Sequence, residues 1–221
     1  MTDEKLIEEI NSKNEYSAED LVKITTLLRH KCPWDAEQTH ESVRKCFIEE
    51  VYEACDAIDN KDPENLCEEL GDVLFQVLFH AELAKEEGLF TLDDVINGVS
   101  RKLIVRHPHV FGDAAASTSA EVLNNWDKIK AKTKGQKTGA ETVRDVPHAL
   151  PALMRAQKTA KRAAKAGLYE HTDDLGELSG EEAKKELGSR LFRLCSAAEK
   201  AGIDAEEALI EETERFLSDI H

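Results

Sequence analysis

Apolar side chains recur every three or four residues along most of the chain, which is the spacing of an amphipathic helix. In the first half, this pattern predicts helices over residues 18–30, 41–60 and 64–87, and a fourth from Thr91 to shortly before Pro108. In the second half the pattern resumes at Ala149, is interrupted around residues 171–180 and continues to the end. The chain is therefore predicted to be all-α.

A short internal repeat links the two halves. Residues 69–75 (Glu-Leu-Gly-Asp-Val-Leu-Phe) match residues 186–192 (Glu-Leu-Gly-Ser-Arg-Leu-Phe), and after each match a glycine precedes an acidic helix start. The repeat predicts two related helical halves, and Ser189 stands where the first half has Asp72. A chance match between two amphipathic helices is the alternative.

Five carboxylates in the first half form the pattern with the clearest chemistry, namely Glu49, Glu50, Glu53, Glu69 and Asp72. Residues three or four apart share a helix face, and the turn at residues 59–63 folds two helices antiparallel. Glu50, Glu53, Glu69 and Asp72 can then converge. Converging carboxylates repel one another unless a cation lies between them. Oxygen ligands select hard cations, so the predicted ion is Mg²⁺, with Mn²⁺ as the alternative.

A solvated acidic surface is the commoner meaning of a Glu-x-x-Glu pattern. The helix over residues 64–87 favours a site instead, because it is apolar nearly all round. Its narrow polar stripe consists of Glu69, Asp72, Gln76 and His80. We therefore expect this helix to be largely buried and Asp72 to need a partner that neutralises it. His80 is either a support for the metal ligands or an ordinary core histidine.

A basic set of residues follows the carboxylates. Lys102 and Arg106 are four residues apart near a predicted helix end, and Trp126 and Lys130 repeat this spacing. Cations beside a metal held by carboxylates are what a polyphosphate substrate requires, and an aromatic ring can stack on a base. On spacing alone, a basic helix end and a core tryptophan are the commoner explanation.

Composition narrows the classes of partner and compartment. The 221 residues include 45 acidic and 29 basic side chains, a net charge of −16, which disfavours nucleic acid and anionic membranes as partners. Nucleotides are not disfavoured, because a bound divalent cation inverts the local charge. The longest uncharged apolar run, residues 73–81, is too short to span a bilayer. The acidic N-terminus and five cysteines without a C-x-x-C pair predict a cytoplasmic protein with free thiols.

Together these motifs resemble the MazG family of nucleoside triphosphate pyrophosphohydrolases, within the all-α NTP pyrophosphatase superfamily. The resemblance runs from about residue 21 to residue 134. Besides the carboxylates it includes Cys-Pro-Trp-Asp at 32–35, Gln-Thr-His at 38–40, Glu-Glu-Gly-Leu-Phe at 86–90 and Arg-His-Pro-His-Val-Phe at 106–111. The resemblance implies a helical bundle assembled as a homodimer. It also implies Mg²⁺-dependent cleavage of NTP or dNTP substrates between the α- and β-phosphates, giving a nucleoside monophosphate and pyrophosphate.

The same resemblance implies a role for each candidate residue. The implied metal ligands are Glu50, Glu53, Glu69 and Asp72, and Glu49 would orient the attacking water. The implied substrate-binding residues are Lys102 and Arg106 as a phosphate clamp, and Trp126 and Lys130 as nucleotide contacts.

The second half departs from the family pattern, because the stretch after Gly167 is short and offers no good counterpart of the second Glu-x-x-Glu helix that two-domain members carry. The predicted organisation is a catalytic domain at 17–134, a linker at 135–148 and a degenerate second repeat at 149–221. Two alternatives stay open. One is an enzyme selective for dNTPs or modified nucleotides, and the other is a non-catalytic helical regulatory dimer that binds nucleotide and metal.

Overall fold

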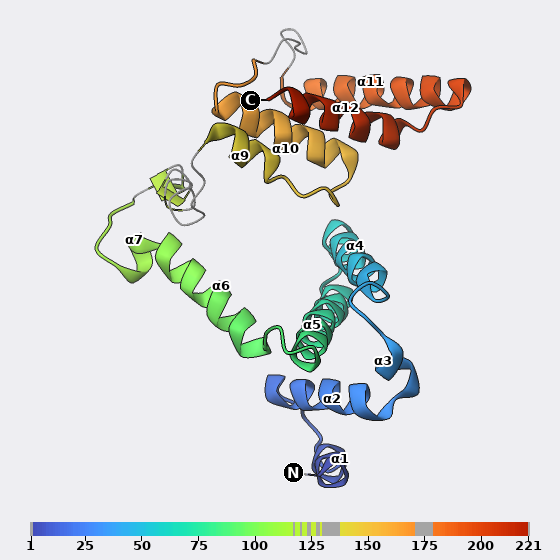
Figure 1. Ribbon diagram of the computed structural model, residues 1–221, viewed down its shortest axis with the longest axis vertical. Coiled ribbons are helices and arrows are strands. Elements are labelled where there is room, and N and C mark those ends of the chain that lie inside the picture. Colours follow the sequence, from blue (N-terminus) through green and yellow to red (C-terminus); the bar gives the residue numbers. More distant parts are fainter. Residues whose placement is uncertain are drawn as a thin grey trace. The chain divides into compact units, whose positions relative to one another are not determined.

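The structure is a computed structural model that describes residues 2–116, 138–170 and 179–220 and seven residues between 117 and 137. In these residues, every regular element is a helix. This confirms the predicted all-α class. The chain divides into two compact units, Met1–Ala116 and Ser117–His221 (Figure 1). None of the described helices combines the length and the hydrophobicity that a membrane-spanning segment needs.

The first unit contains seven helices among its described residues: α1 (Asp3–Asn11), α2 (Ala18–Lys31), α3 (Pro33–Glu37), α4 (Arg44–Asn60), α5 (Pro63–Glu86), α6 (Leu92–Arg106) and α7 (Pro108–Phe111). Local signals set several of these ends. Capping boxes open α2 at Ser17 and α6 at Thr91, and Gly88, with a φ of 69°, follows the end of α5. The predicted helices 18–30 and 64–87 are confirmed, while α4 starts three residues later than the predicted helix 41–60.

A tight turn joins α4 and α5 into an antiparallel hairpin (Figure 1). Lys61 adopts the left-handed conformation at the end of α4, with a φ of 56°. The side chain of Asp62 then accepts hydrogen bonds from the backbone amides of Glu64 and Asn65, which caps α5. Ala54 and Ala57 are buried, and their small side chains let α4 approach α5 closely. The hairpin therefore holds residues of the two helices opposite one another.

Arg29 of α2 connects α3 and the residue that follows it to the far end of α5. Its guanidinium makes two hydrogen bonds to Glu86, at 3.0 and 2.6 Å, and donates to the backbone carbonyls of Asp35 and Gln38. The same group lies 5.5 Å from the ring centroid of Phe79. Arg29 is 8% exposed, so these charge-assisted hydrogen bonds form largely out of water. They place residues 35–40 beside α5.

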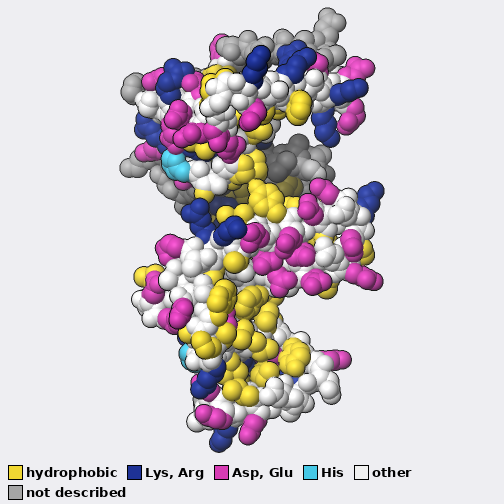
Figure 2. Space-filling view, turned by 90° about the vertical axis from the view of Figure 1, so that its right-hand side faces the viewer, with side chains coloured by type: hydrophobic (Ala, Val, Ile, Leu, Met, Phe, Trp, Pro, Cys, Tyr) yellow, Lys and Arg dark blue, Asp and Glu magenta, His cyan; other side chains and the backbone are white. Residues whose placement is uncertain are grey.

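The N-terminal half of α5 is exposed, so the expectation that this helix is largely buried is wrong there. Leu70 and Leu74 are 54% and 44% exposed, Asp72 is exposed, and the buried residues of α5 begin at Gln76. The reason is that α4 covers one face of this half, whereas α2 and the loop after it pack on the second half. Figure 2 shows hydrophobic side chains gathered on the surface of this unit, next to a group of acidic ones.

The second unit contains α9 (Gly139–Arg144), α10 (Ala152–Lys165), α11 (Gly180–Ala201) and α12 (Ala205–Asp219) among its described residues. α10 packs against α9 and α12 around a core of Ala140, Val143, Ala163, Leu217 and Ile220. α9 lies inside the predicted linker at 135–148, because a capping box at Thr138 starts a helix whose apolar face joins this core. The predicted domain limits at 17–134 and 149–221 stay a prediction.

Candidate functional site

Three carboxylates meet on the α4–α5 hairpin. Glu50 projects from α4, and Glu69 and Asp72 project from α5, one helical turn apart. One side-chain oxygen from each lies within 4.8 Å of the others. In the described part of the chain, no other group of His, Cys, Asp or Glu side chains is arranged in this way. The antiparallel hairpin brings the three together from positions up to 22 residues apart.

The surroundings of Glu50 and Glu69 disfavour their negative charges. Burial, followed by the charges of Asp72, Glu53 and Glu69, raises the pKa of Glu50. Burial and the charges of Glu53 and Asp72 likewise raise the pKa of Glu69. Each shift means that another negative charge is unfavourable here, so a divalent cation between them would be stabilising. A donor set made of carboxylate oxygens fits Mg²⁺ or Mn²⁺ better than a softer metal.

Glu53 and Glu49 differ in their relation to this group. Glu53 is exposed and lies outside the three, yet it is close enough for its charge to raise the pKa of both Glu50 and Glu69. Glu49 forms an ion pair with Lys45 at 3.2 Å on an exposed face of α4. Neighbouring helix residues point about 100° apart, which separates Glu49 from the side of α4 that bears Glu50.

Within the first unit, Lys102 and Arg106 are not brought to the carboxylates. Lys102 and Arg106 lie in the last turns of α6, and α6 leads away from the hairpin (Figure 1). Lys102 is exposed and Arg106 is half-buried. Trp126 is half-buried and belongs to the second unit, and Lys130 lies outside the described residues.

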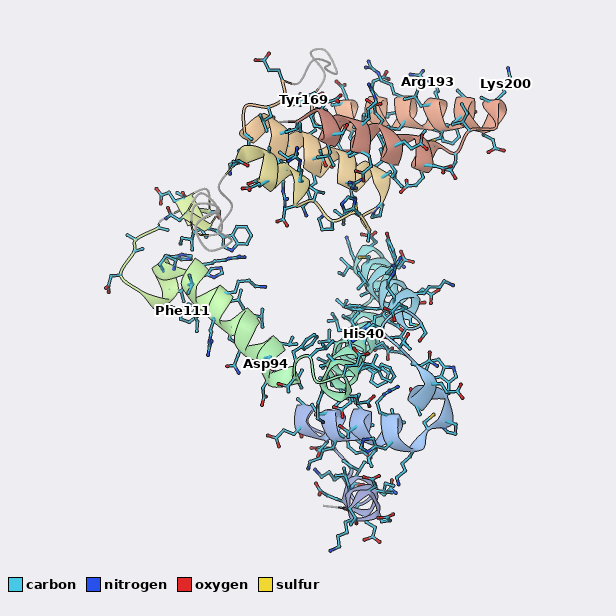
Figure 3. All side chains as sticks on the ribbon, viewed as in Figure 1. His40, Asp94, Phe111, Tyr169, Arg193 and Lys200 are labelled. Carbon is cyan, nitrogen blue, oxygen red and sulfur yellow. The ribbon has the colours of Figure 1, made fainter. Side chains whose placement is uncertain are left out.

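A pair of histidines, His40 and His80, lies further along α5, and the sequence predicted neither this pairing nor a role for His40 beside His80. The Nδ1 atoms of His40 and His80 lie 2.7 Å apart, and the two ring planes are nearly parallel, at an angle of 7°, with centroids 5.0 Å apart. Figure 3 labels His40, which lies beside α5. His80 is a member of the polar stripe on α5, and His40 belongs to the Gln-Thr-His motif. The sequence contained both residues, but no local pattern indicated that they meet.

Comparisons with known proteins place the hairpin within a known domain. The model of the MazG nucleotide pyrophosphohydrolase domain matches residues 38–111, a segment that contains the three carboxylates as well as Lys102 and Arg106. The chain is 40% identical over 203 residues to the nucleoside triphosphate pyrophosphohydrolase of Escherichia coli (strain K12), which covers 84% of this chain and 77% of that protein.

Two proteins of Thermotoga maritima are also similar. The first is described as a nucleoside triphosphate pyrophosphohydrolase/pyrophosphatase MazG, and it is 39% identical over 214 residues, covering 90% of this chain and 82% of that protein. The second is the crystal structure of a MazG-related protein, with 29% identity and a TM-score of 0.46, covering 51% of this chain and 98% of that one.

Proposed function

Because this chain belongs to the MazG family and is a nucleoside triphosphate pyrophosphohydrolase, we propose that it cleaves NTP or dNTP substrates between the α- and β-phosphates with Mg²⁺. The products are then a nucleoside monophosphate and pyrophosphate. The observation that carries this proposal is the group formed by Glu50, Glu69 and Asp72 on the α4–α5 hairpin. Mn²⁺ would fit the same oxygen ligands.

In this proposal the residues of the hairpin hold the ion, and Glu53 is the nearest candidate for a fourth ligand. A bound divalent cation supplies positive charge to the phosphate oxygens and lowers the pKa of a bound water. Hydrolysis forms a bond from the water oxygen to the α-phosphorus and breaks the bond to the bridging oxygen, so that pyrophosphate leaves. The tight turn at Lys61 keeps the ligands preorganised. For Glu49 to orient the water, its side chain has to leave Lys45.

The first test is the identity of the products. With ATP and Mg²⁺, phosphorus NMR is expected to show AMP and pyrophosphate, and excess EDTA is expected to stop the reaction because the carboxylates then hold no cation. ADP and orthophosphate would contradict the cleavage position. Unchanged ATP with measurable binding would instead support the non-catalytic regulatory dimer.

We also propose that the active form is a homodimer. Large apolar side chains are exposed on the two helices of the hairpin and on α6, namely Val51 and Tyr52 of α4, Leu70 and Leu74 of α5, and Leu103 and Ile104 of α6. Exposed apolar area of this kind is typical of a protein interface. Since α6 leads away from the hairpin of its own chain, a second copy would supply Lys102 and Arg106 to the carboxylates.

Mixing two inactive variants tests this arrangement. Asp72→Asn removes a carboxylate and Lys102→Ala removes a clamp residue, so each homodimer is expected to be inactive. If the clamp comes from the second copy, random mixed dimers contain one intact site, and the mixture recovers about a quarter of wild-type activity. Native mass spectrometry distinguishes the mixed dimer from the two homodimers by mass, and the recovered activity should rise with the amount of mixed dimer. A mixture that forms mixed dimers but stays inactive would place the clamp in the same chain as the carboxylates.

The second half of the chain is proposed to support the fold rather than to catalyse. Glu186 of α11 forms ion pairs with Arg190 at 2.8 Å and Arg193 at 3.6 Å, and the hydrogen bond from Arg190 lowers its pKa. A carboxylate with two arginine partners is already neutralised and does not call for a cation.

Glu53→Gln and Glu186→Gln are matched variants that test this division. With saturating Mg²⁺, we expect Glu53→Gln to lose nearly all turnover, because the substitution removes a carboxylate beside the proposed ion. Glu186→Gln is expected to keep most of its turnover. Equal loss in both variants would mean that the second half is part of the active site.

The remaining features support the expected compartment and partners. All five cysteines are free thiols, which is typical of proteins in a reducing compartment, and we propose that the enzyme acts in the cytoplasm. The net charge of −16 disfavours nucleic acid and anionic membranes as partners. It is compatible with small nucleotides as substrates, because these bind together with a divalent cation that offsets their charge.

A further inference from the structure

A cavity of about 500 Å³ lies at the start of α4, against the C-terminal half of α5 and the loop that follows it. His40, Glu41, Arg44, Phe47, His80 and Phe90 are among its lining residues, and the carboxylate group is not. The proposed hydrolysis uses none of these side chains.

The walls of the cavity suit a flat aromatic ring. Phe47 and Phe90 contribute aromatic side chains to the lining, and Val77 and Val95 contribute aliphatic ones. The ring centroid of Phe47 is 5.6 Å from that of His80, so one aromatic wall continues into the histidine pair. Aromatic faces of this kind stack on heteroaromatic bases without depending on the identity of the base.

Hydrogen bonding within the histidine pair assigns a donor to the cavity. The short contact between the two Nδ1 atoms needs one proton between them, and Nε2 of His80 is buried without a hydrogen-bond partner in the described chain. A buried N–H without a partner is rarer than a buried acceptor without one, so we assign the Nδ1 proton to His80. His40 then accepts at Nδ1, carries its own proton on Nε2 and can donate it to a ligand.

Two exposed lining residues add a hydrogen-bond donor and an acceptor. Arg44 supplies guanidinium donors, and Glu41 supplies a carboxylate acceptor. Hydrogen bonds from its own backbone amide and from the Thr39 hydroxyl lower the pKa of Glu41, which keeps the carboxylate ionised. Nucleobases carry ring nitrogens, carbonyl oxygens and amino groups along their edges, so donors and an acceptor together match such an edge.

The cavity lies along the same hairpin as the carboxylates. His80 is eight residues beyond Asp72 on α5, a rise of about 12 Å, and Arg44 is six residues before Glu50 on α4, a rise of about 9 Å. We propose that this cavity binds the nucleobase of the substrate while the triphosphate lies at the carboxylates. The inference rests on the proposed function and adds the place where the base is held.

Phe90→Ala tests the cavity, with Leu89→Ala as the matched control. The two residues are adjacent, 42% and 64% exposed, and Leu89 does not line the cavity. With ATP as substrate, Phe90→Ala is expected to raise KM about tenfold, the size of one lost base–aromatic contact, with little change in kcat. Inhibition by tripolyphosphate, which has no base, should be unchanged. Leu89→Ala should match the wild type in both measurements.

Binding without turnover separates this inference from the proposed function. Adding adenosine, guanosine, cytidine or uridine to the full chain without Mg²⁺ is expected to shift the ring NMR signals of His40 and His80, and Phe90→Ala should weaken these shifts. This result would support the cavity even if the phosphorus NMR experiment contradicted the cleavage position. An equal rise in KM for ATP and in the inhibition constant of tripolyphosphate would overturn the proposal. The proposal would also be overturned if the histidine signals did not move and Phe90→Ala self-associated more weakly than the wild type. The cavity would then be a contact site for a second copy of the chain.

Discussion

Replacing Asp72 with asparagine is expected to lower turnover by about a thousandfold, because the carboxylate group then loses one of its three converging charges. Without metal, the variant should be as stable as the wild type or more stable. The charge of Asp72 raises the pKa of Glu50 and of Glu69, so removing this charge relieves repulsion in the folded state. Activity assays and thermal melts in EDTA measure the two effects.

Magnesium should distinguish the wild type from this variant. At a concentration one hundred times the dissociation constant, a ligand that binds the folded state alone stabilises it by about 2.7 kcal/mol. The wild type should gain stability of this order, and Asp72→Asn should gain little. Asp56→Asn, which changes an exposed aspartate of α4 outside the carboxylate group, serves as the control and should behave as the wild type. A wild type that gains no stability from Mg²⁺ would show that the assigned site is wrong.

A buried arginine in the second unit gives the second large expected effect. The side chain of Arg155 on α10 is 1% exposed and forms an ion pair with Glu214 of α12 at 2.6 Å. His148 also contacts the Glu214 carboxylate, at 2.9 Å. The Nη2 atom of Arg155 also lies 3.1 Å from Nδ1 of His148, and the other two guanidinium nitrogens have no hydrogen-bond partner in the described chain. Glu214 is therefore the carboxylate that neutralises this cation. Removing one partner of a buried pair leaves an uncompensated charge.

Glu214→Gln is therefore expected to lower the free energy of unfolding of the second unit by about 2 kcal/mol. This is less than the roughly 3–5 kcal/mol found for fully buried pairs, because the Glu214 side chain is 45% exposed and water partly replaces it. Hydrogen exchange of the amides in α10 and α12 measures the loss locally.

Glu212→Gln is the control on the same helix. Its pair with Arg215 is exposed on both sides, at 56% and 70%, so the change should stay within about 0.5 kcal/mol. Both variants should keep their turnover if the second half does not catalyse. If the amides of α10 and α12 exchange no faster in Glu214→Gln than in Glu212→Gln, the structural role assigned to the Arg155 pair is wrong.

Features that depend on neighbouring residues could be predicted well from the sequence. The capping boxes at Ser17 and Thr91 and the glycine after α5 act within one helical turn, so the residues that form them lie together in the chain. The spacing of Glu69 and Asp72 places them on one face of any helix they occupy. Motifs in a specific order likewise indicated the family before any contact was known.

Features that depend on how distant segments pack could not be predicted in this way. Apolar residues surround the first half of α5, yet Asp72 is exposed there, because burial depends on how many neighbours cover a helix rather than on its own pattern. His40 and His80 meet across 40 residues because Arg29 holds the loop before α4 against α5. Arg155 looks like an ordinary polar residue of α10 until α12 covers it with Glu214. The spacing of residues along the chain determines which side chains share one face of a helix. The free energy of burying and pairing those side chains depends on which part of the folded chain packs against that face.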